Sequence, residues 1–251
     1  MHILFVYEIN DYVMKTTPRF RGPSLILLAT VHILLFAAGL VAAGILRHGA
    51  PFVTPFAPGE AVRQFFAGNP EAARISSFFL FGSAVPLGIF AVTLVSRLRH
   101  LGVRAAGTNI ALLGGIGACV ALAFSGLASW TLSVPEVAAS IPVTKAIVFF
   151  AFLSGGVGFA VAFGLLVAGA SIPCYFTRLF PRWLVALGVV VALAGELSWF
   201  SLIAYPANFF IPIVRFVGFV WMVLAAVALT RDRRLARGAS PADAEGRSAE
   251  V

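Results

Sequence analysis

Charged residues are scarce in this sequence: they make up 11% of its 251 residues, whereas 60% are hydrophobic. A soluble domain carries about 25% charged and about 45–50% apolar residues. Too few polar side chains remain to cover a surface that faces water, so lipid must cover the outside of the folded chain. The scarcity of charge excludes a soluble globular domain and indicates a polytopic integral membrane protein.

Cysteine and histidine are rare too, which argues against common metal and redox sites. Cys119 and Cys174 match no CxxC or metal-binding spacing, and we expect them at different depths. A haem with two histidine ligands needs two histidines inside the membrane, but only His32 falls within a predicted span. We expect His32 to hydrogen-bond to a neighbouring helix and keep it as a minor candidate site residue. We predict no metal and no cofactor.

Catalytic signatures are also missing: the sequence has no GxSxG elbow, no HExxH helix and no paired-aspartate motif. The glycine-rich strings LGGIGA and SGGVGF sit in the middle of predicted spans, with no strand before them. They therefore do not form phosphate-binding loops. No enzyme class is indicated.

Long hydrophobic runs are what the sequence does have, and six of them are long enough to cross a bilayer. The first run has about 23 residues and exceeds the 7–15 of a signal-peptide core, so we expect a retained helix. We predict an all-α bundle of six transmembrane helices, preceded by a cytoplasmic segment at 1–23 that contains Met14 as an alternative start. The segment 231–251 is charged and rich in small residues and is predicted to be disordered. The predicted spans are 24–46, 75–98, 108–132, 145–170, 182–205 and 209–230.

Local signals refine the ends of two helices. Asn69-Pro70-Glu71 combines an N-cap residue, a proline at the first helical position and an acid in the first turn, so the second helix should begin near Pro70. Pro86 should kink that helix. The run from Ser133 to Glu136 matches a capping box and predicts a short surface helix.

The basic residues give the orientation. Thirteen lysines and arginines fall on one proposed side and four on the other, so the positive-inside rule places both termini in the cytoplasm. The net charge of +8 therefore indicates membrane topology and not nucleic-acid binding. Arginine outnumbers lysine sixteen to two, as in GC-rich bacterial genomes, and we expect a bacterial inner membrane. The four outer cations are Arg47, Arg63, Arg74 and Lys145.

Small residues at four-residue steps predict close helix contacts, because helices in lipid associate through backbone approach. Each of two predicted spans carries such a stripe, and the two stripes are Gly156, Ala160, Gly164 and Ala168, and Gly117, Ala121 and Ser125. We expect them to pack within the bundle. A homodimer or a partner membrane protein that uses the stripes is the alternative.

Two formal charges lie deep in the predicted spans, Glu196 and Arg215. They flank a turn near residue 206, about ten residues before it and nine after it, so at about 1.5 Å per residue they lie at similar depths. An isolated charge there costs at least about 2.5–3.5 kcal/mol. We therefore predict an ion pair between Glu196 and Arg215, which acts either as a static clamp or as a ligand or proton site.

The overall plan resembles a class of uncharacterised bacterial six-span proteins. Two segments carry the resemblance, ARISSFFLFGSAVPLGIFAVTLVSRLRHLG at 73–102 and PRWLVALG at 181–188. The resemblance covers roughly residues 24–230 and implies membrane topology, with no activity or site residue to carry over.

Two function hypotheses follow. The leading one is a non-enzymatic structural, accessory or regulatory membrane subunit, because no polar pathway or catalytic constellation is present. The alternative is a small transporter or ligand-binding membrane protein with an outward-facing site at Glu196 and Arg215. Inverted three-helix repeats with broken helices are common in transporters, but Pro86 and Pro212 do not occupy corresponding positions here.

Overall fold

The computed structural model describes residues 22–238, with side chains for residues 22–230. All regular elements in that part of the chain are helices, and six stretches are long and apolar enough to cross a membrane. The predicted all-α bundle of six spans is therefore confirmed. Of the predicted N-terminal segment at 1–23, residues 1–21, which include Met14, lie outside the described residues. The predicted disordered tail at 231–251 is wrong for residues 231–238, which continue α10, and its remainder lies outside the described residues.

The six spans match the predicted ones in order and number, but several are longer than predicted. The fourth span runs from Ile141 to Phe176, and α10 continues to Gly238, beyond its predicted end at residue 230. In chain order the spans are α2 (Leu25–Leu46), α4 (Pro70–His100), α5 (Gly107–Thr131), α7–η1–α8 (Ile141–Leu153, Ser154–Gly158, Phe159–Phe176), α9–η2 (Arg182–Leu197, Ser198–Leu202) and η3–α10 (Tyr205–Phe209, Phe210–Gly238).

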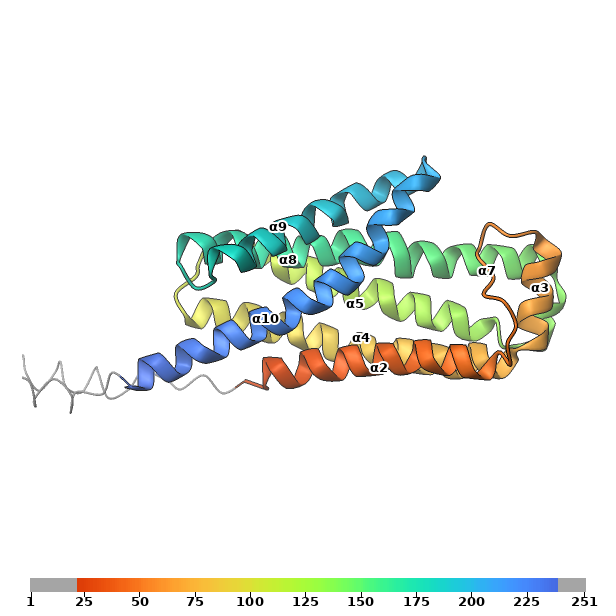
Figure 1. Cartoon of the computed structure of the whole chain (residues 1–251), viewed down its shortest axis with the longest axis horizontal. Coiled ribbons are helices and arrows are strands. Elements are labelled where there is room, and N and C mark those ends of the chain that lie inside the picture. The colour runs from red at the N-terminus through yellow and green to blue at the C-terminus, as the bar shows by residue number, and fades with distance from the viewer. Residues whose placement is uncertain (1–21, 239–251) are drawn as a thin grey trace, which may run out of the picture.

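The long helices run lengthwise, and the short helix α3 (Gly59–Gly68) lies across one end of them (Figure 1). The short helix α6 (Pro135–Ala139) joins α5 to α7. The start of α2 and the loops after α4 and α8 lie at the opposite end, where Arg99, Arg104 and Arg178 are found. The charges are therefore segregated as the orientation prediction requires, although the side that faces the cytoplasm remains a prediction.

The start of α4 confirms one local prediction and corrects its mechanism. The helix begins at Pro70, as expected, but the Asn69 side chain caps nothing in α4. Its amide instead donates a hydrogen bond of 2.8 Å to the Phe65 carbonyl, at the end of α3. Asn69 therefore closes the preceding helix. The helix α4 also continues through Pro86 as one uninterrupted helix.

The short helix α6 forms where the capping box predicts one, but the box itself does not. Its N-cap residue is Val134, and no side chain makes a capping hydrogen bond. The hydroxyl of Ser133 is buried without a hydrogen-bond partner among the described residues.

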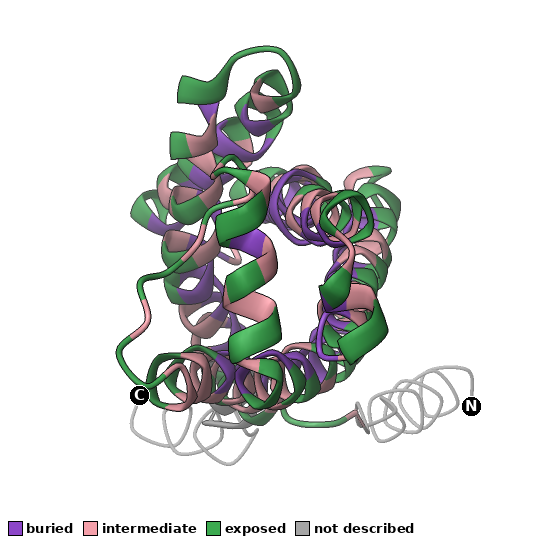
Figure 2. Cartoon of the chain, turned by 90° about the vertical axis from the view of Figure 1, so that its right-hand side faces the viewer, coloured by how far each residue is buried: buried purple, intermediate pink, exposed green. Residues whose placement is uncertain are grey.

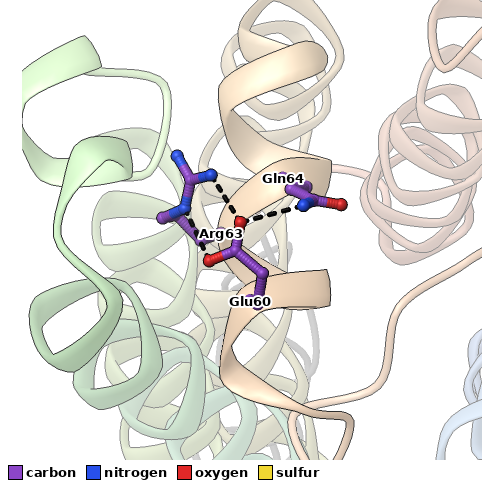
Figure 3. Close-up of polar contacts among 3 residues, drawn as sticks. All are labelled: Glu60, Arg63 and Gln64. Carbon is purple, nitrogen blue, oxygen red and sulfur yellow. Dashed lines mark hydrogen bonds and ion pairs between the residues drawn. The ribbon is translucent and has the colours of Figure 1, made fainter.

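The helix α3 was not predicted from the sequence. Glu60 accepts hydrogen bonds from Arg63 at 3.0 Å and from Gln64 at 2.8 Å, and these contacts brace its first turns (Figure 3). These donors lower the pKa of Glu60 from 4.5 to about 2. The preceding loop is held to α7 by Lys145, whose ammonium donates to the carbonyl oxygens of Pro55 and Ala57 at 2.6 and 2.9 Å. Together these contacts build an ordered cap over the end of the bundle.

Glycine lets the central helices touch backbone to backbone. A Cβ at Gly169 of α8 would lie 2.5 Å from the Gly107 carbonyl oxygen and the Ala111 nitrogen of α5. Gly164, in the predicted stripe, packs in the same way against α9, where Ala192 O and Gly195 Cα lie 3.2 Å from the position of an added Cβ. The stripe of the fourth span is therefore used inside the bundle in this region. Figure 2 shows the result: buried residues on the facing sides of the helices and exposed ones outside.

The hairpin formed by α9 and α10 departs from this close packing. Its tip is built from two short 3₁₀ segments, η2 and η3, and not from a simple tight turn at Pro206. In Figure 1 α10 crosses the other helices diagonally, and its beginning stands away from α7. A cavity lined by Phe152 of α7 and by Ile211 and Arg215 of α10 lies between these two helices.

Candidate functional site

The structure does not bring Glu196 and Arg215 together. Glu196 is exposed on α9 and makes no hydrogen bond or ion pair with any residue in the described part of the chain. The one ion pair between residues 22 and 230 joins Glu60 to Arg63 on α3. The predicted pair of Glu196 and Arg215 is therefore wrong as a contact.

Counting residues from the turn predicts similar depths for Glu196 and Arg215, but it does not predict which faces of their helices they occupy. Equal depth does not fix rotation about the helix axis, because each residue turns an α-helix by about 100°. The intervening 3₁₀ turns, with about three residues per turn, alter that rotation again. As a result the carboxylate of Glu196 points outward from the bundle, whereas Arg215 points inward.

Arg215 is held by two aromatic rings and one backbone carbonyl. Its guanidinium carbon lies 4.8 Å from the ring centre of Phe36 on α2 and 4.7 Å from that of Phe159 on α8. Its Nη2 donates a hydrogen bond to the carbonyl oxygen of Gly155. Its Nε is buried without a hydrogen-bond partner among the described residues. One of the five guanidinium N–H groups is thus used within the described structure, and no acidic side chain there forms an ion pair with Arg215.

The acceptor of Arg215 belongs to a π-helical turn, η1, inside the fourth span. Here the N–H of Phe159 donates to the carbonyl of Ser154, five residues back, where a regular helix would bond four residues back. A side chain at position 155 would collide with the hydroxyl of Ser125, which itself donates to the Ala151 carbonyl at 2.8 Å. Position 155 therefore requires glycine, and π-turns of this kind are frequent at functional sites.

A cavity of about 330 Å³ lies beside Arg215. Among the residues that the structure describes, Arg215 is the one charged residue in its lining. Most of the rest is apolar, and the one hydroxyl, that of Ser125, is already donated to a backbone carbonyl. The lining consists of Phe36, Leu40, Ser125, Ala151, Phe152, Gly155, Gly156, Ile211, Pro212, Arg215 and Phe216.

His32, the minor candidate, lies one turn before Phe36 on α2. Its Nδ1 is 2.7 Å from the carbonyl oxygen of Ser83 on α4, so Nδ1 carries the proton and donates it. This is the interhelical hydrogen bond expected from the sequence. The Nε2 atom is buried without a partner among the described residues, and Phe219 meets the ring edge-on at 5.3 Å. His32 does not line the cavity.

A second buried arginine lies near the opposite end of the bundle, in the last turn of α4. Arg97 is 4% exposed and donates to the carbonyl oxygen of Leu229 on α10 at 3.1 Å. It borders a smaller cavity of about 150 Å³ together with the start of α2. Arg97 ties α4 to α10, whereas Arg215 faces an open cavity, which makes Arg215 the stronger candidate for a ligand site.

Comparison with known proteins gave no match: no family model, curated protein or solved structure is significantly similar to the chain. The resemblance to uncharacterised six-span proteins stays a prediction.

Proposed function

We propose that this integral membrane protein binds an amphipathic small molecule in the cavity between α2, η1 and α10, with Arg215 as the polar anchor. One observation carries the proposal: a partly buried guanidinium with no carboxylate partner in the described structure lines an apolar cavity of about 330 Å³. Pockets for small molecules measure about 300–1,000 Å³ and combine apolar walls with a few placed polar groups.

The energetics of Arg215 allow the site to be stable without ligand and still able to bind one. A charged residue inside a span costs at least about 2.5–3.5 kcal/mol. Each cation–π contact recovers about 0.5–2 kcal/mol, and the hydrogen bond to Gly155 recovers more. The unused N–H donors leave further stabilisation for an acceptor that enters the cavity.

The experiment blocks the cavity from its lipid-facing rim. Leu40 lines the cavity and is 49% exposed, so a larger side chain there can cover the opening without disturbing the core. Leu34, 62% exposed on the same helix, lies outside the cavity and is the matched control. In native mass spectrometry of protein purified with lipids, wild type and Leu34→Trp should retain a common small-molecule adduct that Leu40→Trp loses. An identical adduct pattern in all three proteins would refute the proposal.

A structural or accessory role is the second candidate, and the contacts of Arg215 favour it in one respect. The guanidinium ties α10 to α2 and to the π-turn, as a static clamp would. On this reading Arg215→Met lowers thermal stability but leaves the adduct pattern unchanged. Loss of the adduct without loss of stability favours ligand binding.

The proposed orientation places both ends of the chain in the cytoplasm, with α3 and the tip of the α9–α10 hairpin on the outer side. The segregation of cations between the two ends of the bundle supports it. Reporter fusions after Gly102 and after Arg178 should report the cytoplasm, and fusions near Gly68 and Glu136 should report the outside. Either cytoplasmic site reporting the outside would overturn the orientation.

A further inference from the structure

We infer that the occupant of the Arg215 cavity is a single-chain amphiphile with a carboxylate head, such as a fatty acid, which enters sideways from the bilayer. The inference rests on the proposed function and names its ligand class. Three properties of the cavity lead to it: the geometry of its donors, its charge and its depth in the membrane.

The donor geometry favours a carboxylate. A guanidinium presents its N–H groups in a planar fork that matches the two oxygens of a carboxylate. In Arg215 the rings of Phe36 and Phe159 lie within cation–π distance of the guanidinium, Nη2 contacts Gly155, and the Nε–H is unpartnered among the described residues. A neutral head such as an alcohol would satisfy fewer of these donors and leave the charge uncompensated.

The charge balance favours a monoanion. In the described part of the chain, the cavity lining contains one cation and no acidic residue. A carboxylate neutralises that single charge. A phosphate monoester carries about −1.5 to −2 charges near neutral pH, so it would bring an uncompensated negative charge into a low-dielectric site.

The depth of the site favours a free amphiphile over a resident phospholipid. Phe36, which contacts Arg215, lies midway along α2, about 15–17 Å from each end of that helix at 1.5 Å per residue. The headgroup of a bilayer phospholipid stays near the ends of the spans. A free fatty acid can sink to this depth because Arg215 meets its charge there.

The rim of the cavity gives the route of access. Its inner wall includes Phe36, which is 6% exposed, whereas Leu40 and Phe216 at its rim are 49% and 53% exposed. These rim residues lie inside predicted spans, so their exposed surface faces lipid. An acyl chain can therefore lie along the rim while its carboxylate reaches Arg215.

The test compares three single-chain probes of equal length: oleate, oleyl alcohol and oleoyl lysophosphatidate, titrated into the purified full-length protein in detergent. Arg215→Met and Arg215→Lys remove the charge and the fork respectively, and Arg74→Met, an exposed cation on α4, is the matched control. Native mass spectrometry counts bound probe, and a thermal melt in parallel checks that each variant is folded.

We expect wild type and Arg74→Met to bind oleate at least about tenfold more tightly than oleyl alcohol, since a charge-assisted hydrogen bond is worth that much. Arg215→Met should lose the preference, Arg215→Lys should keep part of it, and Leu40→Trp should bind neither probe. If Arg215→Met does not fold, the comparison of oleate with oleyl alcohol in wild type and in Arg215→Lys still tests the carboxylate assignment.

Each other result points to a specific failure. Equal binding of oleate and alcohol that Leu40→Trp still abolishes overturns the carboxylate assignment but leaves the proposed function standing. Tighter binding of lysophosphatidate than of oleate assigns the head to a phosphate and refutes the inference. Probe binding that Leu40→Trp leaves unchanged overturns both the inference and the proposed function.

Discussion

The packed body of the bundle and the outer half of the α9–α10 hairpin differ in how closely their helices approach one another. In this packed part, α8 approaches the first turn of α5 so closely at Gly169 that a single added carbon would overlap backbone atoms. At the hairpin tip, by contrast, Trp199, Ile203 and Phe209 are 54%, 84% and 69% exposed. Figures 1 and 2 show the same contrast, with close helices in the body and an exposed tip, although the ring of Tyr205 at the tip meets that of Phe56 at 4.8 Å.

The difference follows from where the sequence places its small residues. In lipid, helices associate by backbone approach and van der Waals contact, because burial of apolar surface gives no advantage there. The segment 196–211, ELSWFSLIAYPANFFI, contains no glycine and only Ala204 and Ala207 as small apolar residues. Bulky side chains therefore keep the start of α10 away from α7, and the cavity of Arg215 lies where the helices diverge.

The largest effect is expected from a methyl group added in the packed body. Gly169→Ala puts a Cβ 2.5 Å from two backbone atoms of α5, which cannot move independently. Overpacking of this kind costs about 1–3 kcal/mol or more, so the melting temperature in detergent should fall by roughly 5 °C. Gly44→Ala on α2 is the control, because nothing lies within 4 Å of its added carbon. A fall of equal size in both variants would show that the body is not packed as described.

Two glycines of one stripe sharpen the comparison, because one faces the packed region and the other faces the open one. The Cβ of Gly164→Ala would lie 3.2 Å from backbone atoms of α9, whereas that of Gly156→Ala would meet the flexible end of Ile211 at 3.3 Å. Gly164→Ala should destabilise by about 1 kcal/mol, and Gly156→Ala should be neutral or stabilising by helix propensity. Differential scanning fluorimetry in one detergent measures both. A larger loss at Gly156 would mean that the hairpin closes on η1.

The packed region could largely be predicted from the sequence, since hydrophobic length gives the spans and small residues mark the contacts. The open region could not. The depths of Glu196 and Arg215 follow from counting residues, but their faces depend on the 3₁₀ turns of the hairpin, and these have no clear sequence signal. The candidate ligand site therefore contains Arg215, one residue of the predicted pair, but not Glu196.

Two further features had weak signals. The π-turn lies at SGGVG, where two adjacent glycines allow close approach to Ser125, but helical spacing alone does not predict a π-turn. The helix α3 has an acid and a base three residues apart, Glu60 and Arg63, which is a helix-compatible spacing. The helix α3 mixes polar and apolar residues within a long polar connection, so its sequence alone did not distinguish it from a loop.

A mutant cycle tests whether the two intramembrane charges are independent. Arg215→Met removes the contacts to Phe36 and Gly155 but also the cost of a buried charge, so its net effect on stability should stay within about 1 kcal/mol. Glu196→Gln removes an exposed carboxylate inside a span, where an isolated charge is costly, so it should leave stability unchanged or raise it. The double variant should equal the sum of the two, because the residues share no contact. Recovery of stability in the double variant would indicate that Glu196 and Arg215 do form an ion pair, and would contradict the described geometry.

The smallest effect is expected outside both regions, in the cap helix α3. Hydrogen bonds from Arg63 and Gln64 lower the pKa of Glu60 from 4.5 to about 2, so the native state favours the ionised carboxylate. A depressed acid pKa stabilises the fold above its unfolded value, and this contribution is lost as the pH falls from about 4.5 towards 2. The melting temperatures of wild type and Glu60→Gln should therefore differ slightly at pH 7 and converge near pH 2. The difference should be small because the pair is exposed to solvent and screened by salt.

Glu136→Gln on α6 is the control for this prediction. The carboxylate of Glu136 makes no hydrogen bond within the described residues, so the substitution should leave the melting curve unchanged at both pH values. A Glu60→Gln difference that persists unchanged at pH 2 would show that the carboxylate charge does not stabilise α3.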